Sequence, residues 1–298
     1  MQENRLWLLL LLMSFYVSAQ TKGVVVDESG KPIPYVNIWV ENENIGTTSE
    51  ENGEFSINVS DNKYLIFSAI GYETQRKISN ILDKIVLTSN AIELNEVIVK
   101  ANNSKQIEIG NFDSPRGRYT AIEGKEEYLV AKYFQYKPNY DSTQFIKNII
   151  ILTKSEVKGA TFRVRILKVD QEGKPSESLI EDNIIINTKK GKRKNIIDIS
   201  KYNLTFPIEG IFIAFEVLLI ERNKYKNSYT LENTSQKIKE NCYAPNLLAK
   251  IVAEENTYHT FKGMWIKTKR NHNGETSKRY IFFNHKVMEP AINLTLTN

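Results

Sequence analysis

Short runs of β-branched and aromatic residues alternate along the chain with clusters of Gly, Pro, Asn and Asp. Residues 55–59 alternate strictly between apolar and polar side chains, and the almost wholly apolar residues 64–69 are predicted to form a central strand. No stretch between the runs shows helical periodicity over enough residues to predict a helix, so the pattern predicts an antiparallel β-sandwich. Its predicted strands are 22–26, 35–40, 55–59, 64–69, 81–87 and 94–99.

The same pattern resumes after residue 119 and predicts a second β-sandwich, with a jelly roll as one arrangement of its strands. Residues 121–132 have only approximate helical spacing, so a short helix and an edge strand both remain open there. Residues 162–169 alternate nearly perfectly, which predicts one buried face and one cationic face. The other strands are predicted at 145–153, 179–186, 195–199, 210–220, 264–268, 280–284 and 291–297, with a turn at 271–274.

Turn and linker signals divide these strands. The segment Asp27–Pro32 places Gly and Pro between two strands and predicts a hairpin, and Asp170–Pro175 repeats it almost letter for letter. The flanking residues do not repeat, so shared turn chemistry explains the similarity better than an internal duplication does. The polar stretch 100–118 is predicted to be a linker.

The chain begins with a targeting signal. Arg5 precedes an apolar run at residues 6–17, and small residues precede Gln20, as signal peptidase requires. Residues 1–19 are therefore predicted to be a signal peptide, with an uncleaved membrane anchor as the minor alternative because the run is short for a bilayer span. Cleavage after Ala19 would export 279 residues, with no transmembrane segment after cleavage.

The overall composition is ordinary, but the charged residues are distributed unevenly along the chain. Of the 298 residues 41% are hydrophobic and 25% charged, which is ordinary for a globular protein and argues against disorder or a coiled coil. Residues 20–99 carry a net charge of −6 and residues 100–298 a net charge of +11, so two electrostatically different units follow one another. The single Cys242 excludes an intramolecular disulfide and any Cys-based metal site.

The first unit also carries a motif. The order G-x-V-x-D-x-x-G-x-P-I-P-x-V-x-I at residues 23–38 is followed by G-T-T, by G-x-F-x-I, by a strand ending in S-x-I-G-Y and by L-x-E-V-x-V at residues 94–99. This order resembles the carboxypeptidase-regulatory-like domain of Bacteroidota surface proteins. The resemblance implies a transthyretin-like sandwich that lies beside the catalytic domain in metallocarboxypeptidases and precedes the plug in TonB-dependent receptors. It also implies that the domain itself carries no catalytic residues.

Motifs for catalysis are weak. His272–Glu275 has the H-x-x-E spacing of a zinc carboxypeptidase, but it lies in a predicted turn, and His259, His272 and His285 fix no coordination geometry. The sequence has no G-x-S-x-G elbow and no phosphate-binding loop, and Cys242 is expected to be a buried inert thiol. We therefore predict no catalytic residues, no metal site and no cofactor.

Two features are candidates for binding. Tyr133 and Tyr136 lie in an aromatic stretch at residues 128–145, and Tyr rings beside Asn and Asp suit stacking on sugars, although packing at a sandwich edge explains most of them. Lys192 and Arg193 belong to a basic run at residues 189–194, predicted as a hairpin tip, which is either a solvated turn or a contact for anionic polymers.

The leading hypothesis is therefore a non-enzymatic envelope or surface protein. Its basic sandwich would bind an envelope glycan, a surface polymer or an envelope protein, and no nucleic acid, because the chain is exported. One rival is a structural spacer or docking accessory of a TonB-type outer-membrane transport system. Another is a glycan hydrolase built on the second sandwich. The predicted location is the periplasm, the outer membrane or the cell surface.

Overall fold

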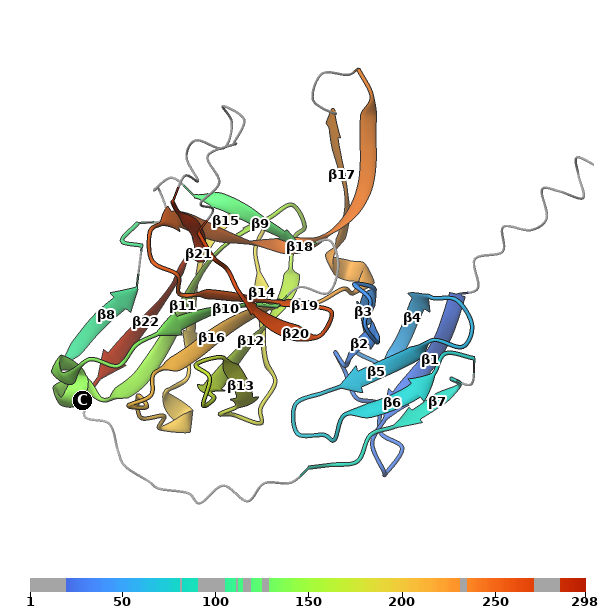
Figure 1. Ribbon diagram of the computed structural model, residues 1–298, viewed down its shortest axis with the longest axis horizontal. Coiled ribbons are helices and arrows are strands. Elements are labelled where there is room, and N and C mark those ends of the chain that lie inside the picture. The colour runs from blue at the N-terminus through green and yellow to red at the C-terminus, as the bar shows by residue number, and fades with distance from the viewer. Residues whose placement is uncertain are drawn as a thin grey trace, which may run out of the picture.

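The computed structural model describes residues 20–80, 82–90, 105–110, 112–114, 119–124, 129–230, 235–270 and 285–298. The predicted signal peptide, the strands at 94–99 and 280–284 and the turn at 271–274 lie outside these ranges. The rest is almost entirely β-structure in two units (Figure 1). Within the described part, the helices are short 3-10 turns, and none combines the length and apolar character of a membrane-crossing helix. These turns are Pro138–Thr143 (η2), Ser200–Tyr202 (η3) and Glu221–Asn223 (η4).

The N-terminal unit packs a three-stranded sheet, in the order β4-β1-β7, against a four-stranded sheet, in the order β3-β2-β5-β6. Phe55 and Ile57 of β4 are buried between exposed neighbours, as their alternation predicts, and they share one core with Leu65 and Phe67 of β5. Strand β5 lies between β2 and β6, so the predicted central position is confirmed. The strands are Gln20–Val26 (β1), Asn37–Val40 (β2), Gly46–Thr48 (β3), Glu54–Asn58 (β4), Tyr64–Ser68 (β5), Gln75–Ile78 (β6) and Lys84–Val86 (β7).

The turn Asp27–Pro32 forms a short hairpin, closed by an antiparallel bridge between Val26 and Pro32, but this hairpin does not join β1 to β2. Strand β1 pairs with β4 and β7, and β2 pairs with β3 and β5, because the chain crosses from one sheet to the other at this turn. Asp27 Oδ1 accepts the amides of Ser29 and Lys31, each at 2.9 Å, and Gly30 has a φ of 84°. In the second copy of the motif, Asp170 Oδ1 accepts two amides at 2.8 Å in the same way.

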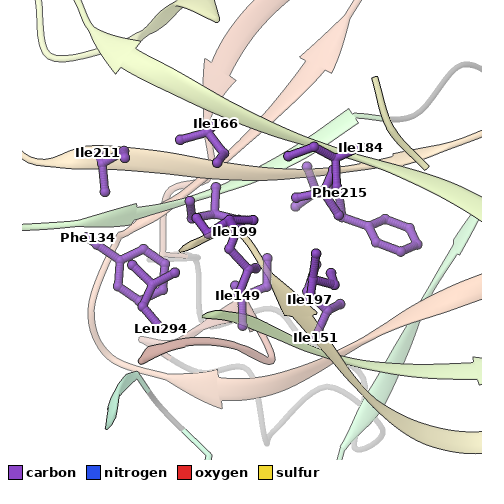
Figure 2. Packing of buried hydrophobic residues seen from close by; sticks show 14 of the residues in the cluster. Phe134, Ile149, Ile151, Ile166, Ile184, Ile197, Ile199, Ile211, Phe215 and Leu294 are labelled. Atoms are coloured by element: carbon purple, nitrogen blue, oxygen red, sulfur yellow. The ribbon is translucent and has the colours of Figure 1, made fainter. Parts of the chain in front are cut away.

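The C-terminal unit packs a seven-stranded sheet against an eight-stranded sheet, so the prediction of an all-β chain with two sandwiches is confirmed. The core between the sheets is formed mainly by Ile, Leu and Phe, as Figure 2 shows. The first sheet contains Leu129–Phe134 (β10), Ala160–Val169 (β12), Pro175–Ser178 (β13), Ile184–Thr188 (β14), Ile211–Val217 (β16), Thr257–Phe261 (β19) and Met264–Lys267 (β20). The second contains Gln106–Gly110 (β8), Thr120–Gly124 (β9), Phe145–Ser155 (β11), Gly191–Asp198 (β15), Lys224–Thr230 (β17), Lys237–Val252 (β18), Val287–Pro290 (β21) and Ile292–Thr297 (β22).

Three local predictions change. Residues 121–124 belong to β9 and residues 129–132 to β10, so the helix alternative is wrong in the described part of this stretch. The edge-strand alternative holds for β9, which pairs only with β18 among the described strands, but not for β10, which lies between β16 and β19. The linker prediction is wrong for residues 106–110, since β8 pairs with β22 over five residues. The basic run is not a hairpin tip, because β14 pairs with β12 in one sheet and β15 pairs with β11 in the other.

The longest strand, β18, has no counterpart in the sequence prediction. Its first half pairs with β17, and together they form a two-stranded ribbon that projects from the body of the second unit (Figure 1). Its second half lies in the body and pairs with β9, β11 and β21. The ribbon was missed because its residues are mostly polar on both faces, so it lacks the alternation that identifies a half-buried strand.

Candidate functional site at the junction of the two units

The two candidate tyrosines are partly buried and pack into different clusters. Tyr133 packs on Phe212, with ring centroids 5.1 Å apart, and its hydroxyl donates to the carbonyl of Glu209 at 2.9 Å. Tyr136 packs against the core between the sheets, and its hydroxyl donates to Asp141, a hydrogen bond that raises the pKa of this tyrosine. The two rings therefore do not form one stacking platform.

The two candidate cations lie on the other sheet. Lys192 and Arg193 belong to β15, opposite Lys154 and Thr153 of β11. The ammonium group of Lys192 lies 4.4 Å from the centre of the Tyr119 ring, and an Arg193 guanidinium nitrogen donates to the carbonyl of Lys192 at 3.2 Å. Lys192 and Arg193 are consecutive residues of β15, so their side chains point to opposite faces of the sheet, and neither is joined to the tyrosines. Their role in binding stays a prediction.

The described residues hold no group of three or more His, Cys, Asp or Glu side chains that could bind a metal ion. Burial lowers the pKa of His259, whose Nδ1 lies 3.1 Å from Thr268 Oγ1. Cys242 is buried, as expected, and forms no disulfide in the described part of the chain. His272 lies outside the described residues.

The most elaborate polar arrangement lies where the two units meet. Glu216 of β16 accepts hydrogen bonds from Arg163 at 2.8 Å and from Arg165 at 2.5 Å, both on the neighbouring strand β12. Arg163 is 1% exposed and Glu216 is 2% exposed. The predicted cationic face of β12 is therefore wrong at Arg163, because the N-terminal unit covers this side chain and a carboxylate neutralises it.

Opposing effects set the charge of this cluster. Burial disfavours the carboxylate, but the two guanidinium groups and the hydrogen bonds outweigh burial and hold the pKa of Glu216 below its ordinary value. Burial lowers the pKa of Arg163, and Glu216 opposes that shift. Guanidinium groups remain protonated in proteins, so the cluster is an ion network with one carboxylate and two cations.

The N-terminal unit supplies a further acceptor for Arg163, whose Nε is buried without a hydrogen-bond partner among the described residues. A guanidinium nitrogen of Arg163 donates to the backbone carbonyl of Tyr35, which lies just before β2. Tyr35 has a φ of 58°, in the left-handed region that bulky residues rarely adopt. Its side chain packs with Leu218 and Ile220 of the second unit, and its hydroxyl accepts from Arg222 at 3.4 Å. Contacts across the junction therefore hold Tyr35 through its backbone and through its ring.

Further contacts extend the junction. The amide of Leu219 donates to Thr48 Oγ1 at 3.1 Å, and the amide of Glu221 donates to a carboxylate oxygen of Glu50 at 2.8 Å. The turn between β19 and β20 also reaches the N-terminal unit, because a Cβ added at Gly263 would lie 3.0 Å from Trp39 Nε1. A groove of about 870 Å³ lies beside these contacts, between β3 and β4 of one unit and β17 and β18 of the other.

A second buried ion pair lies inside the C-terminal sandwich. Lys132 of β10 lies 3.2 Å from Glu289 of β21, so the pair joins the two sheets, and the Lys132 ammonium also donates to the carbonyl of Ile292 at 3.0 Å. Asn256 donates to the other carboxylate oxygen of Glu289 at 3.1 Å. Burial lowers the pKa of Lys132 to about 8 despite the nearby carboxylate.

Both ion pairs were missed in the sequence, although a signal for one was present. Glu216 is the only charged residue in the apolar run at 211–220, and a carboxylate in a fully buried strand requires a cationic partner. The alternating Arg163 and Arg165 were the available partners. What the sequence did not show is that β12 and β16 are neighbours and that another unit covers them.

Comparison with known proteins identifies the first unit. Residues 21–99 match the family model described as the CarboxypepD_reg-like domain. The N-terminal unit is therefore a carboxypeptidase-regulatory-like domain, and the resemblance inferred from its motifs is confirmed.

Among curated proteins, the N-terminal region is similar to two receptors of Formosa agariphila. It is 39% identical over 106 residues to TonB-dependent receptor P3, a match that covers 33% of this chain and 10% of the receptor. It is 34% identical over 101 residues to TonB-dependent receptor P39, covering 31% of this chain and 10% of that receptor. The aligned region thus spans about a tenth of the length of these relatives.

Among solved structures, the chain resembles a clostridial cysteine protease, Cwp84, after propeptide cleavage. The TM-score is 0.36 with 9% sequence identity, over 89% of this chain and 65% of the protease. A similarity of this size carries no argument about fold or activity.

Proposed function

We propose that this chain is an exported, non-enzymatic accessory protein of a TonB-type outer-membrane transport system. The observation that carries the proposal is the similarity of the N-terminal region to two TonB-dependent receptors. In this proposal, the regulatory-like domain docks with a receptor, and the C-terminal sandwich holds that domain in a fixed orientation. The apolar run at residues 6–17 supports export.

The junction supports a fixed orientation. Transient contacts between domains are usually small and polar, so relative motion is the default expectation. Here Arg163, buried by the N-terminal unit, bonds to the carbonyl of Tyr35, and Leu219 and Glu221 bond to Thr48 and Glu50. Separation of the units would leave Arg163 and Glu216 with incomplete coordination. The two units should therefore act as one body when a partner binds either of them.

A glycan-binding role for the second sandwich is the alternative. The four candidates Tyr133, Tyr136, Lys192 and Arg193 lie in separate clusters, which favours docking over a single glycan platform built from them. A hydrolase on this sandwich is the third candidate and would require two facing carboxylates in a cleft.

Affinity capture tests the proposal. The full chain, purified without its first 19 residues, is used as bait in detergent extracts of the envelope of its own organism. The proposal predicts that a TonB-dependent receptor is retained at about one copy per bait, as identified by mass spectrometry. Retention of polysaccharide with no receptor would favour the glycan alternative, and retention of neither would overturn the docking proposal. The quadruple alanine variant of the four candidates is the matched control, and it should retain the receptor equally.

A further inference from the structure

The groove at the junction contains an open strand edge. Among the described strands, β4 pairs only with β1, so its other side has no neighbour in the sheet. All five residues of β4 line the groove, and its volume of about 870 Å³ falls in the range of ligand sites, roughly 300–1,000 Å³. We call it the edge groove and define it by Thr47, Glu54, Ser56, Asn58, Asp83 and Tyr243.

The hydrogen bonds of β1 fix the direction in which each residue of β4 points its backbone groups. The amide of Val25 donates to the carbonyl of Gly53, just before β4, at 2.9 Å. The amide of Val24 donates to the other side, to the carbonyl of Asp83 just before β7, at 3.2 Å. Because backbone groups alternate between the two sides of a strand, every second residue of β1 from Val25 backwards faces β4.

This alternation leaves two residues of β4 with outward backbone groups. Phe55 and Ile57 lie opposite the residues of β1 that face β4, so they exchange hydrogen bonds with that strand. Ser56 and Asn58 therefore turn their N–H and C=O groups away from β1 and toward the open side. Both line the edge groove, Ser56 half-buried and Asn58 exposed, and no hydrogen bond from the described residues engages their backbone on this side.

The open stretch of this edge is short and regular. The edge is closed at Glu54, because its amide donates to Asn52 Oδ1 at 3.1 Å and its carbonyl accepts the amide of Glu50 at 2.7 Å. Beyond it, Ser56 and Asn58 offer two donors and two acceptors, and two residues of an extended strand separate them by about 6.8 Å. Another extended polypeptide repeats its own donors and acceptors at the same spacing, so an added strand is the ligand that matches this pattern.

Charge narrows the choice of polypeptide. Four carboxylates and two lysines line the edge groove, and one of each is already paired, Lys224 with Glu221 at 2.7 Å. The remaining three carboxylates outnumber the remaining lysine, and Glu54 and Asp83 are exposed and form no ion pair among the described residues. A basic ligand is therefore favoured. A second copy of the chain fits less well, because its N-terminal unit also carries a net charge of −6 and its own β4 lies in a groove.

We propose that the edge groove binds an extended basic segment of a partner protein, which adds to the sheet as a further strand beside β4. The backbone groups of Ser56 and Asn58 hold the segment through hydrogen bonds. Side chains of the added strand point alternately to the two faces of the sheet, so every second one lies on the face of Glu54, where Lys or Arg is favoured. The backbone supplies affinity, and the charges select among extended segments.

The site does not depend on the proposed function. It follows from backbone geometry and charge, whereas the receptor docking rests on the sequence similarity of the N-terminal region. If a receptor uses this edge, a variant that blocks the edge loses both the receptor and peptides. If a receptor docks elsewhere, the same variant keeps the receptor and loses only peptides, so the two proposals fail separately.

Peptide selection on the full chain without residues 1–19 tests the proposal. The probe is a phage-displayed library of random decapeptides, and the selected peptides are synthesised for calorimetry and hydrogen exchange. The proposal predicts peptides enriched in Lys and Arg, and at least about tenfold slower exchange of the Ser56 and Asn58 amides in the complex. Selection of no peptide, selection of acidic peptides, or a complex without slower exchange at these two amides would overturn the proposal.

The free chain tests the other occupants of the edge. Ultracentrifugation should show a monomer, in which the amides of Ser56 and Asn58 exchange quickly. Slow exchange in a dimer would show that a second copy fills the edge, and slow exchange in a monomer would show that the chain fills it with its own residues. Either result would overturn the proposal.

Proline variants separate strand addition from other modes of peptide binding. Ser56→Pro removes an outward amide, which an edge strand tolerates, and should lower peptide affinity about tenfold or more. The matched control is Ile78→Pro on β6, an edge strand of the other sheet. The amide of Ser79 donates to the carbonyl of Lys63, just before β5, at 2.8 Å, so the amide of Ile78 also points outward. This control should change affinity by less than about twofold, and equal losses would overturn the proposal.

Two further measurements apply even if Ser56→Pro does not fold. N-methylation of a selected peptide at every second residue should abolish binding in only one of the two possible registers, because half of the peptide amides face β4. Glu54→Lys should lower affinity at least about fivefold, whereas Glu28→Lys, at an exposed position outside the groove, should change it by less than about twofold. Equal effects of the two registers, or equal losses in the two variants, would overturn the proposal.

Discussion

The two buried ion pairs of the C-terminal sandwich differ in what surrounds them. Lys132 and Glu289 join the two sheets of one sandwich and take their other hydrogen bonds from that sandwich. Arg163 and Glu216 belong to the same sandwich, but Arg163 also donates to a backbone carbonyl of the N-terminal unit. The first pair therefore stabilises a fold, whereas the second links that fold to another domain. A buried charge therefore marks a domain junction only when some of its hydrogen-bond partners belong to the other domain.

The largest effect is expected from Glu216→Gln. The substitution leaves Arg163 and Arg165 together without their carboxylate, and an uncompensated buried charge costs about 3–5 kcal/mol of unfolding free energy. Urea denaturation followed by circular dichroism measures this loss. The control is Glu177→Gln, which removes an exposed carboxylate paired with Lys168 and should cost less than about 1 kcal/mol. Equal losses in the two variants would contradict the role assigned to the junction network.

A somewhat smaller loss is expected from Lys132→Met, about 3 kcal/mol. Glu289 and the carbonyl of Ile292 both lose a buried hydrogen-bond donor that the lysine supplies in its charged and in its neutral form, while Glu289 keeps the hydrogen bond from Asn256. The double variant Lys132→Met with Glu289→Leu should recover most of this loss, since apolar side chains of similar size replace the whole pair. Denaturation midpoints of the three proteins measure the coupling. No recovery in the double variant would show that the two residues act independently.

The pH dependence of stability distinguishes the two pairs. The pKa of Lys132 is about 8 in the folded protein and about 10.4 in an unfolded chain, so the unfolded state binds more protons between these values. The burial penalty on the charged lysine is present below pH 8 and disappears as the pH rises, which should stabilise the wild type by about 2 kcal/mol from pH 7 to pH 10. Subtracting the same measurement on Lys132→Met isolates this contribution, and a difference of zero or of opposite sign would refute the assignment. The arginine pair should show no such rise, because its guanidinium groups stay charged.

The smallest effect is expected from Thr48→Val at the junction. The variant keeps the shape of the side chain but removes the oxygen that accepts the amide of Leu219, at a cost of about 1 kcal/mol. Hydrogen exchange should show faster exchange at Leu219 with little change in the sandwich cores. Thr47→Val, on the opposite face of β3, is the matched control. Faster exchange in the control but not in Thr48→Val would argue against this hydrogen bond.

Local sequence patterns predicted much of the fold. The alternation at Phe55 and Ile57 correctly predicted the buried face of β4, and the Gly and Pro residues of the shared motif correctly predicted both turns. The hydrogen bonds that Asp27 and Asp170 accept in these turns were not predicted. Which strands become neighbours depends on contacts far apart in the chain, so the pattern wrongly joined β1 to β2 and β14 to β15 as hairpins. The ribbon escaped prediction because exposed strands of polar residues carry no alternation.

The candidate site was less predictable than the fold. Tyr133 and Tyr136 were predicted to bind a ligand because they lie in an aromatic stretch. In the structure, both rings pack against phenylalanine side chains of the sandwich instead. Arg163 was placed on a solvated face, since a strand pattern cannot reveal that a second domain covers that face.

Strand β18 also has a mechanical consequence. Residues 237–242 of β18 pair only with β17 among the described strands, and Tyr243 pairs with both β17 and β9. The second half of β18 pairs with β9, β11 and β21. A force applied to the ribbon along the strand axis would load the hydrogen bonds of the second half in shear, where many must break together. A sideways force would instead act on residues 237–242, which pair with β17 alone among the described strands. The ribbon should therefore resist a pull along the axis of β18 more strongly than a sideways force.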